Sequence, residues 1–330
     1  MKKKTQLQHL IRRTRAFRNL ISVDYTNVPQ MLKQAKLNFP IETRDLYYKA
    51  GADTPYQVLP TNTAVINSRT KELLGVAGKG YKIADNTFVG CLAHDIAQEL
   101  GSKITYAGRL RSGNFAPGSR ICFQALLGTE QVADDVLVKQ LIITSSHDMS
   151  MSITFYLGLL KIICANGLVA YDKKFNNLIK VKHTANYKES IKEARKKLLT
   201  ANSTYNTLKH NLEVMARTKF RKRESSKAAY NLGSQMYPPA ISKTHPEKGW
   251  STTTKAENKR KRLVELYDAE EVDHSVYRVY QAATYFIDHD RAISYNKDYD
   301  DGSEYFNNII TGSGNELKKK AYTICLGMAV

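Results

Sequence analysis

Between residues 56 and 186, short apolar runs alternate with turn-forming residues. Two β-prone runs, 56–66 and 72–83, flank the turn-forming segment Asn67–Thr70, and this arrangement predicts a β-hairpin. Further β-prone runs follow, separated by glycine and proline, and they predict the strands 104–111, 120–128, 136–146 and 152–164.

A helix is expected between the hairpin and these later strands. Asp85 or Asn86 can cap its start, and Gly101 can end it just after Leu100. The apolar residues that recur on it at helical spacing are Phe88, Cys91, Leu92 and Ile96. A hairpin, a helix and then several strands predict an α+β fold with a mainly antiparallel sheet, and not a doubly wound fold.

Helical periodicity dominates the second half of the chain. Apolar residues recur along one face from Tyr187 to about Phe220, and lysines and arginines cover the other face, so long basic helices are expected to pack with the sheet. Glycines, prolines and threonines in 224–256 predict a flexible loop. The basic run Lys259–Arg262 then opens a helix that continues to about Tyr267.

Two more helices are expected at about 275–288 and 317–328, with an acidic, tyrosine-rich loop at 296–315. The chain is therefore expected to have three parts. These are a basic N-terminal helix and arm (1–55), an α+β core sheet (56–186), and a helical region with a flexible basic loop at 224–262 and an acidic tail (187–330).

The net charge of +19 is unevenly distributed along the 330 residues. Residues 1–23 hold seven basic and no acidic side chains, and residues 187–262 hold 19 basic and six acidic ones. Residues 263–330, in contrast, hold six basic and 12 acidic side chains. This asymmetry favours a polyanionic partner, most simply nucleic acid, and the alternative is a merely solvated basic surface.

Composition also limits the other classes of function. No apolar run is long enough to cross a bilayer, so no membrane association is expected. The N-terminus lacks the apolar region of a secretory signal, and its arginines fit either a basic amphipathic arm or a mitochondrial transit peptide. The four cysteines lie far apart in apolar settings, without zinc-site spacing, so they are expected to be buried thiols. No cofactor is expected.

His147 and Asp148 follow an apolar strand and are the best candidates for chemistry. They could act as a general base with an orienting carboxylate, or join His183 and Asp288 in a metal site for a nuclease. Adjacent residues on a strand point to opposite faces, however, so the other interpretation is that Ser145, Ser146 and Asp148 bond the backbone of a tight turn.

Two glycine-containing segments are expected to be structural. Gly75–Gly80 lacks the pattern of a phosphate-binding loop. Gly78-Lys79-Gly80 within it predicts a strand with a bulge or a close backbone approach. Asn166-Gly167 predicts a turn after a buried strand.

Basic and aromatic residues suggest a different activity. Tyrosines lie near basic residues at Tyr47-Tyr48-Lys49 and around Tyr106, and tyrosine rings can stack bases while lysine and arginine follow phosphates. The alternative is that these tyrosines are ordinary half-buried strand residues. The candidate nucleic-acid-binding residues are Arg12, Arg13, Arg15, Lys79, Tyr81, Arg109, Arg111, Arg217, Lys219, Arg221, Lys222, Arg223, Lys259, Arg260, Lys261 and Arg262.

Three blocks in order along the chain carry a family resemblance. The first is Leu74–Tyr81; the second is Ser146-His147-Asp148 with Cys164–Leu168 and Lys182–Thr184; the third is Ala282–His289 with Leu317–Ala321. Together they resemble the phage/plasmid-like protein family of unknown function. Met149 stands where that family usually has glycine. The resemblance implies a mobile-element setting and a cytoplasmic protein of a bacterial host, and it carries no catalytic residues.

The predicted hairpin-then-helix core is also loosely similar to phage single-strand annealing proteins, whose fold implies rings or filaments along DNA. We therefore expect a non-enzymatic protein that binds single-stranded DNA as a homo-oligomer for annealing or recombination. The alternatives are a metal-dependent nuclease and a virion or plasmid-maintenance interaction protein.

Overall fold

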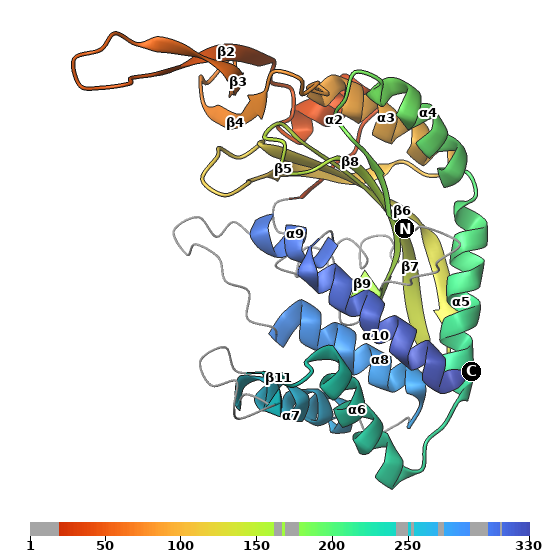
Figure 1. The fold of residues 1–330 in the computed structure, drawn as a ribbon. Helices are drawn as coiled ribbons and strands as arrows, with labels where there is room; N and C mark the ends of the chain where they lie inside the picture. Colours follow the sequence, from red (N-terminus) through yellow and green to blue (C-terminus); the bar gives the residue numbers. More distant parts are fainter. Residues whose placement is uncertain are drawn as a thin grey trace.

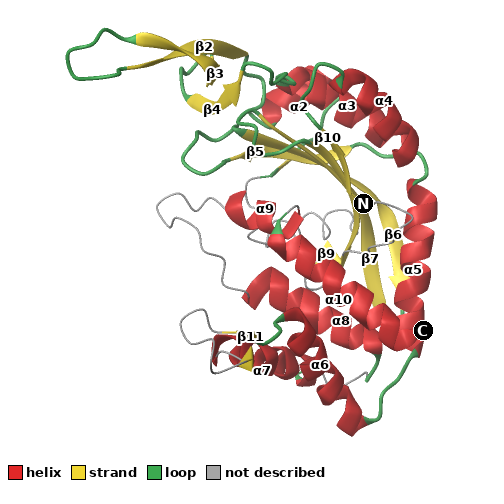
Figure 2. Ribbon diagram, in the orientation of Figure 1, coloured by secondary structure: helices red, strands yellow, loops and turns green. Residues whose placement is uncertain are grey.

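The computed structural model describes residues 20–161, 167–168, 178–241, 250–251, 254–269, 274–290, 303–310 and 312–330. A seven-stranded sheet lies between helices that cover its two faces, and a smaller three-stranded sheet projects from one end (Figures 1 and 2). Every strand pair among the described residues is antiparallel. The predicted α+β fold with a mainly antiparallel sheet is therefore confirmed.

The main sheet contains all four strands that were predicted after the helix. Its order is β1 (Ile21–Ser22), β5 (Ile104–Leu110), β6 (Arg120–Val132), β7 (Asp135–Ser146), β8 (Ile153–Lys161) and β10 (Leu178–Val181), with β9 (Gly167–Leu168) on β8. The predicted turn residue Asn166 lies outside the described residues, and so does the end of the run 152–164.

Alternation along the strands gives the two faces of this sheet different neighbours. One face carries apolar residues such as Phe123, Leu141 and Phe155, and these pack in one cluster with residues of α3 (Asn86–Glu99), α4 (Tyr187–Leu198) and α5 (Ala201–Arg217). The opposite face places Tyr106, Gln124, Ile142 and Tyr156 in one cross-strand row. Tyr106, Ile142 and Tyr156 of this row pack against Phe306, Ile309 and Ile310 of α9 (Ser303–Ile310). Both faces are thereby buried, as a sheet with helices on each side requires.

The small sheet, here called the wing, is formed by β2 (Ile41–Tyr48), β3 (Gln57–Asn67) and β4 (Leu73–Gly78). The β3–β4 pair is the predicted hairpin and is confirmed. β2 lies in the segment that was expected to form an arm, because its apolar periodicity is poor. In the structure it is a strand with mostly exposed side chains. The β2–β3 hairpin extends away from the rest of the molecule (Figure 1).

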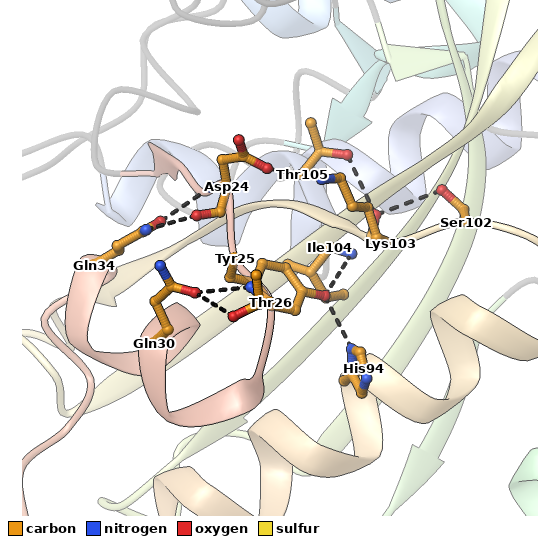
Figure 3. A network of polar contacts seen from close by, with 10 residues as sticks. All are labelled: Asp24, Tyr25, Thr26, Gln30, Gln34, His94, Ser102, Lys103, Ile104 and Thr105. Atoms are coloured by element: carbon orange, nitrogen blue, oxygen red, sulfur yellow. Dashed lines mark hydrogen bonds and ion pairs between the residues drawn. The ribbon is translucent and has the colours of Figure 1, made fainter.

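The segment before the wing is also more ordered than an arm. α2 (Val28–Gln34) begins at the N-cap Asn27, whose side chain accepts a hydrogen bond from Gln30 N. The Tyr25 hydroxyl accepts a hydrogen bond from Ile104 N (3.2 Å) and forms another with His94 Nδ1 (3.0 Å), as Figure 3 shows. These contacts attach the segment to both β5 and α3.

The helix after the hairpin has the predicted ends but a different buried face. Asp85 caps it by accepting a hydrogen bond from Phe88 N at 2.7 Å, and Gly101 follows it at φ +71°. The residues buried on it include Val89, Leu92, Ala93, Ile96 and Ala97. Cys91, expected in the core, is exposed, because the small residues Gly90, Ala93 and Ala97 face the packed neighbours instead.

The helical region departs from prediction at two places, a break in a predicted helix and a helix in a predicted loop. The predicted helix from Tyr187 to Phe220 is two helices, α4 and α5, with a break at Leu199–Thr200. The loop predicted at 224–256 was wrong over its first part, which forms α6 (Lys222–Met236). α6 packs on α7 (Thr254–Asp268), and Gly233 allows this approach, because a Cβ there would lie 3.2 Å from Arg260 Cα.

The remaining elements complete the helical side. Between α6 and α7 lie the paired β11 (Ala240–Ile241) and β12 (Trp250–Ser251). The predicted helices near 275–288 and 317–328 are present as α8 (Val276–Tyr285), which continues into the π-helical turn η3 (Phe286–Asp290), and as α10 (Ser313–Ala329). The loop predicted at 296–315 contains α9 and the start of α10 instead. None of the described helices combines the length and apolarity that a membrane span needs.

Candidate functional site

The end of β7 meets the wing at a tightly packed corner. A Cβ on Gly75 of β4 would lie 2.5 Å from Asp148 Cα, so only glycine allows the two backbones to approach this closely. The close approach lies at Gly75 and not at Gly78-Lys79-Gly80, where it was predicted, since a Cβ on Gly78 or Gly80 would meet nothing closer than 3.9 Å. It brings together the first two sequence blocks of the family resemblance.

His147 lies at the centre of this corner and is fully buried. Its Nε2 is 3.0 Å from Asn86 Oδ1, while Asn86 Nδ2 donates to Leu37 O at 2.9 Å. Because the Asn86 amide already donates through its nitrogen, its oxygen accepts a hydrogen bond from His147 Nε2–H. Burial lowers the pKa of His147 to about 4, and the neighbouring His183 adds to this effect. His147 is thus a neutral structural donor.

His183 supports the corner from the other side. Its Nδ1 donates to Lys82 O at 3.0 Å, and its ring stacks on Tyr81 with the ring centroids 4.6 Å apart. The Tyr81 hydroxyl donates to Ser146 O at 2.7 Å, and burial raises the pKa of this phenol. Tyr81 was predicted to stack bases, but its ring stacks on His183 and its hydroxyl bonds Ser146 O within the protein.

Asp148 and Ser146 form the tight turn that the second interpretation predicted, whereas Ser145 Oγ lies 3.4 Å from His183 Nε2 instead. The Asp148 carboxylate accepts hydrogen bonds from Ser150 N and Ser150 Oγ, and Ser146 Oγ bonds the backbone of Met151. Met149 occupies the left-handed region at φ +65°, where glycine is favoured. His147 Nε2 donates its hydrogen bond to Asn86 and not to Asp148, so His147 and Asp148 do not form a catalytic dyad.

Asp288, the fourth residue of the alternative metal site, belongs to another cluster. It lies on η3 and pairs with Lys318 of α10, whose Nζ is 2.9 Å from Asp288 Oδ1. Both side chains are almost fully buried. Among the described residues, no group of three or more His, Cys, Asp or Glu side chains is arranged to hold a metal ion.

The candidate nucleic-acid-binding residues of the N-terminal half differ in how far they are exposed. Arg12, Arg13 and Arg15 lie outside the described residues. Lys79 is exposed at the end of β4. Arg109 and Arg111 are half-buried beside β5, and Arg111 Nη1 donates to Phe115 O at 3.2 Å.

The basic run Lys259–Arg262 is not part of a loop and lies within α7. Arg260 is buried, and its guanidinium donates to Tyr237 O at 2.6 Å and lies 3.5 Å from Glu257. Arg262 pairs with Asp290 at 2.6 Å, and Lys259 lies over the Tyr237 ring. Arg260, a candidate nucleic-acid-binding residue, is therefore not exposed, because the fold uses its guanidinium internally.

The other basic run, Arg217–Arg223, joins α5 to α6 and is here called the basic connector. Its backbone is fixed: Phe220 N donates to His274 O at 2.8 Å, and Val276 N donates to Thr218 O at 3.0 Å. Side chains alternate along it, with Phe220 packed against the core. The exposed basic side chains are Arg217, Lys219 and Arg221, while Lys222 and Arg223 form the first turn of α6.

Many of the tyrosines that the structure describes are core residues, on helices as well as on strands, and not only the half-buried strand residues of the structural alternative. Tyr106, Tyr156, Tyr205, Tyr280 and Tyr322 are almost fully buried. Among the described residues, the strongly exposed tyrosines are Tyr47, Tyr48 and Tyr56 on the β2–β3 hairpin. Tyr106, one of the tyrosines near basic residues, is therefore not exposed to stack a base. Tyr56 was not among the candidates, because its position at a hairpin tip depends on the unpredicted strand β2.

Comparison with known proteins gives a family without an assigned activity. Neither the curated proteins nor the solved structures contain a match to this chain. The model of one family, described as a domain of unknown function (DUF932), matches residues 73–310. This range includes the corner, the main sheet from β5 onward, the basic connector and most of the helical region. The chain therefore belongs to the DUF932 family.

Proposed function

We propose that this protein binds nucleic acid through the basic connector. The observation that carries the proposal is the placement of Arg217, Lys219 and Arg221, which are exposed on a backbone that is hydrogen-bonded to residues 274–276. Cations held on a fixed backbone bind phosphates with little loss of chain entropy. The strongly positive segment 187–262 surrounds them.

The preferred ligand in this proposal is single-stranded DNA, bound by a homo-oligomer that acts in annealing or recombination. The resemblance to the phage/plasmid-like family supports a role in a mobile element within the cytoplasm of a bacterial host. The order of β3, β4 and α3 supports the loose similarity to single-strand annealing proteins, at the level of fold alone.

The test is a salt titration of binding to fluorescent single-stranded DNA, duplex DNA and RNA, with and without magnesium. We expect affinity to fall steeply as salt rises, because phosphate neutralisation releases counterions. Replacing Arg217, Lys219 and Arg221 together by alanine is expected to weaken binding at least about tenfold and to flatten the salt dependence.

A matched control separates the connector from net charge. Lys180, Lys182 and Lys192 are exposed elsewhere, on and next to β10 and on α4, and their replacement by alanine removes the same three charges. Equal losses in the two triple variants would mean that the connector is not the site. Weak binding at low salt by the unaltered protein would refute nucleic-acid binding altogether.

A further inference from the structure

The tip of the β2–β3 hairpin carries a compact group of exposed aromatic and aliphatic side chains. Ten large hydrophobic side chains are exposed among the described residues, and four of them, Tyr47, Tyr48, Tyr56 and Val58, lie on this one hairpin. Tyr56 is 70% exposed and Tyr47 is 60% exposed. Exposed apolar side chains that cluster in this way mark interaction surfaces, whereas scattered ones are ordinary.

Strand register places most of these residues on one face. Tyr47 lies opposite Val58 across the β2–β3 pair, so their side chains share a face. Lys49 and Tyr56 follow at the alternate positions toward the tip, and Lys49 Nζ lies 5.3 Å from the centre of the Tyr56 ring. Tyr47, Lys49, Tyr56 and Val58 are here called the tyrosine patch. Tyr48 lies on the opposite face and bonds Gln57 Oε1 through its hydroxyl at 2.9 Å.

The cation of the patch is held in place by the turn. Lys49 Nζ donates to Ala52 O at 2.9 Å, and Gly51 N and Thr54 Oγ1 close the same turn at 2.9 Å. The ammonium group is thereby kept beside the Tyr56 ring. An aromatic ring with a fixed cation next to it suits a ligand that is itself planar and carries a neighbouring negative charge.

We infer that the tyrosine patch stacks the unpaired bases of single-stranded nucleic acid while Lys49 contacts the adjoining phosphate. This inference rests on the proposed function and specifies its ligand. Rings of this kind stack any base, so recognition needs no sequence readout. Duplex DNA keeps its bases stacked internally and cannot present them to a hairpin tip. A stable protein partner needs about 800 Å² on each side, which four side chains at a tip do not provide.

The patch and the basic connector can be tested independently, because they lie at opposite ends of the molecule (Figure 1). Tyr47 and Tyr56 are replaced together by leucine, which keeps apolar bulk and removes the ring. Their joint replacement by phenylalanine retains the ring. Tyr48→Leu is the matched control on the opposite face. Thermal unfolding of each full-length variant verifies that it is folded.

Binding is measured with an oligodeoxythymidylate of about 30 nucleotides, a length that exceeds one binding site, and with a duplex of the same length. The leucine variant is expected to lose about tenfold or more in affinity for the single strand, with unchanged duplex affinity and an unchanged salt slope. The phenylalanine variant and Tyr48→Leu are expected to bind like the unaltered protein.

Three outcomes would overturn the inference. The first is equal loss on single strand and duplex, and the second is unchanged single-strand binding by the leucine variant. If the connector variant loses binding in the second case, the proposed function stands and the patch has no part in it. The third is dissociation of the leucine variant into smaller species by light scattering, which would identify a second copy of the chain as the occupant.

Discussion

Two segments of this chain are rich in arginine and lysine, and the fold treats them differently. In the basic connector, Arg217, Lys219 and Arg221 are exposed, and the side chain of Arg217 keeps 77% of its accessible surface although it lies 3.7 Å from Glu213. In the run Lys259–Arg262, Arg260 is buried and Arg262 pairs with Asp290. A basic run therefore indicates a ligand surface only where the fold leaves its cations facing solvent.

The difference follows from local backbone geometry. α7 turns Arg260 toward α6, where Gly233 leaves space for its side chain. The connector is extended, and it pairs through Lys219 with Ser275. Extended backbone points alternate side chains to opposite sides, so Phe220 packs inward while Lys219 and Arg221 face outward.

Arg260→Met gives the largest expected effect on stability and tests whether the α7 run is structural. The change leaves Tyr237 O and Glu257 without the guanidinium that binds them. We expect the free energy of unfolding to fall by about 3 kcal/mol, as when one partner of a buried ion pair is removed. Denaturant unfolding measures it, with the exposed Lys261→Met as control. Lost DNA binding with unchanged stability would reverse the assignment of this run.

His147 provides a second test of whether a basic side chain has a structural role, because the fold buries it and keeps it uncharged. Its pKa is about 4 in the folded protein and ordinarily 6.5, so the unfolded chain binds the proton more tightly. The stability that this difference provides is present above pH 6.5 and is lost as the pH falls toward 4. We expect a loss of about 2 kcal/mol between pH 7 and pH 5.

Unfolding curves across this pH range provide the measurement. His147→Gln retains a donor for Asn86 but cannot titrate, so its unfolding free energy should depend less on pH. The burial of His183 also lowers its pKa and leaves part of the dependence in place. An identical pH dependence in His147→Gln would contradict a neutral, buried His147.

Arg221→Ala and Arg262→Ala compare one cation from each run in binding. Arg221 is expected to contact a phosphate, so its loss should weaken single-strand binding about threefold and reduce the salt slope by about 0.7. Arg262 is already paired with Asp290 and Glu265, and its loss should leave the slope unchanged. Equal slopes in these two variants would remove the distinction between the runs.

The smallest expected effect is that of Arg262→Gln on stability. The ion pair with Asp290 is partly exposed, since the Arg262 side chain keeps 46% of its surface. Water screens such pairs, so the free energy of unfolding should fall by only about 0.5 kcal/mol. A loss as large as that of Arg260→Met would mean that exposure does not separate the cations of this helix.

Local patterns in the sequence predicted much of the fold and part of the site. The hairpin, the Asp85 cap and the four later strands were found because alternation and turn residues act over a few neighbouring positions. The turn at Asp148 was predicted from short polar side chains that bond nearby backbone. The charge distribution along the chain is likewise a property of the sequence by itself.

Only the tertiary structure decided which of these residues face solvent. α6 lies in a predicted loop and packs on α7, where Gly233 approaches Arg260, 27 positions further along the chain. β2 depends on pairing with β3, and Tyr81 is withdrawn from the surface by His183, more than 100 positions away. A sequence window contains the periodicity that forms a helix or strand. It does not contain the distant partner that buries a cation or leaves it exposed.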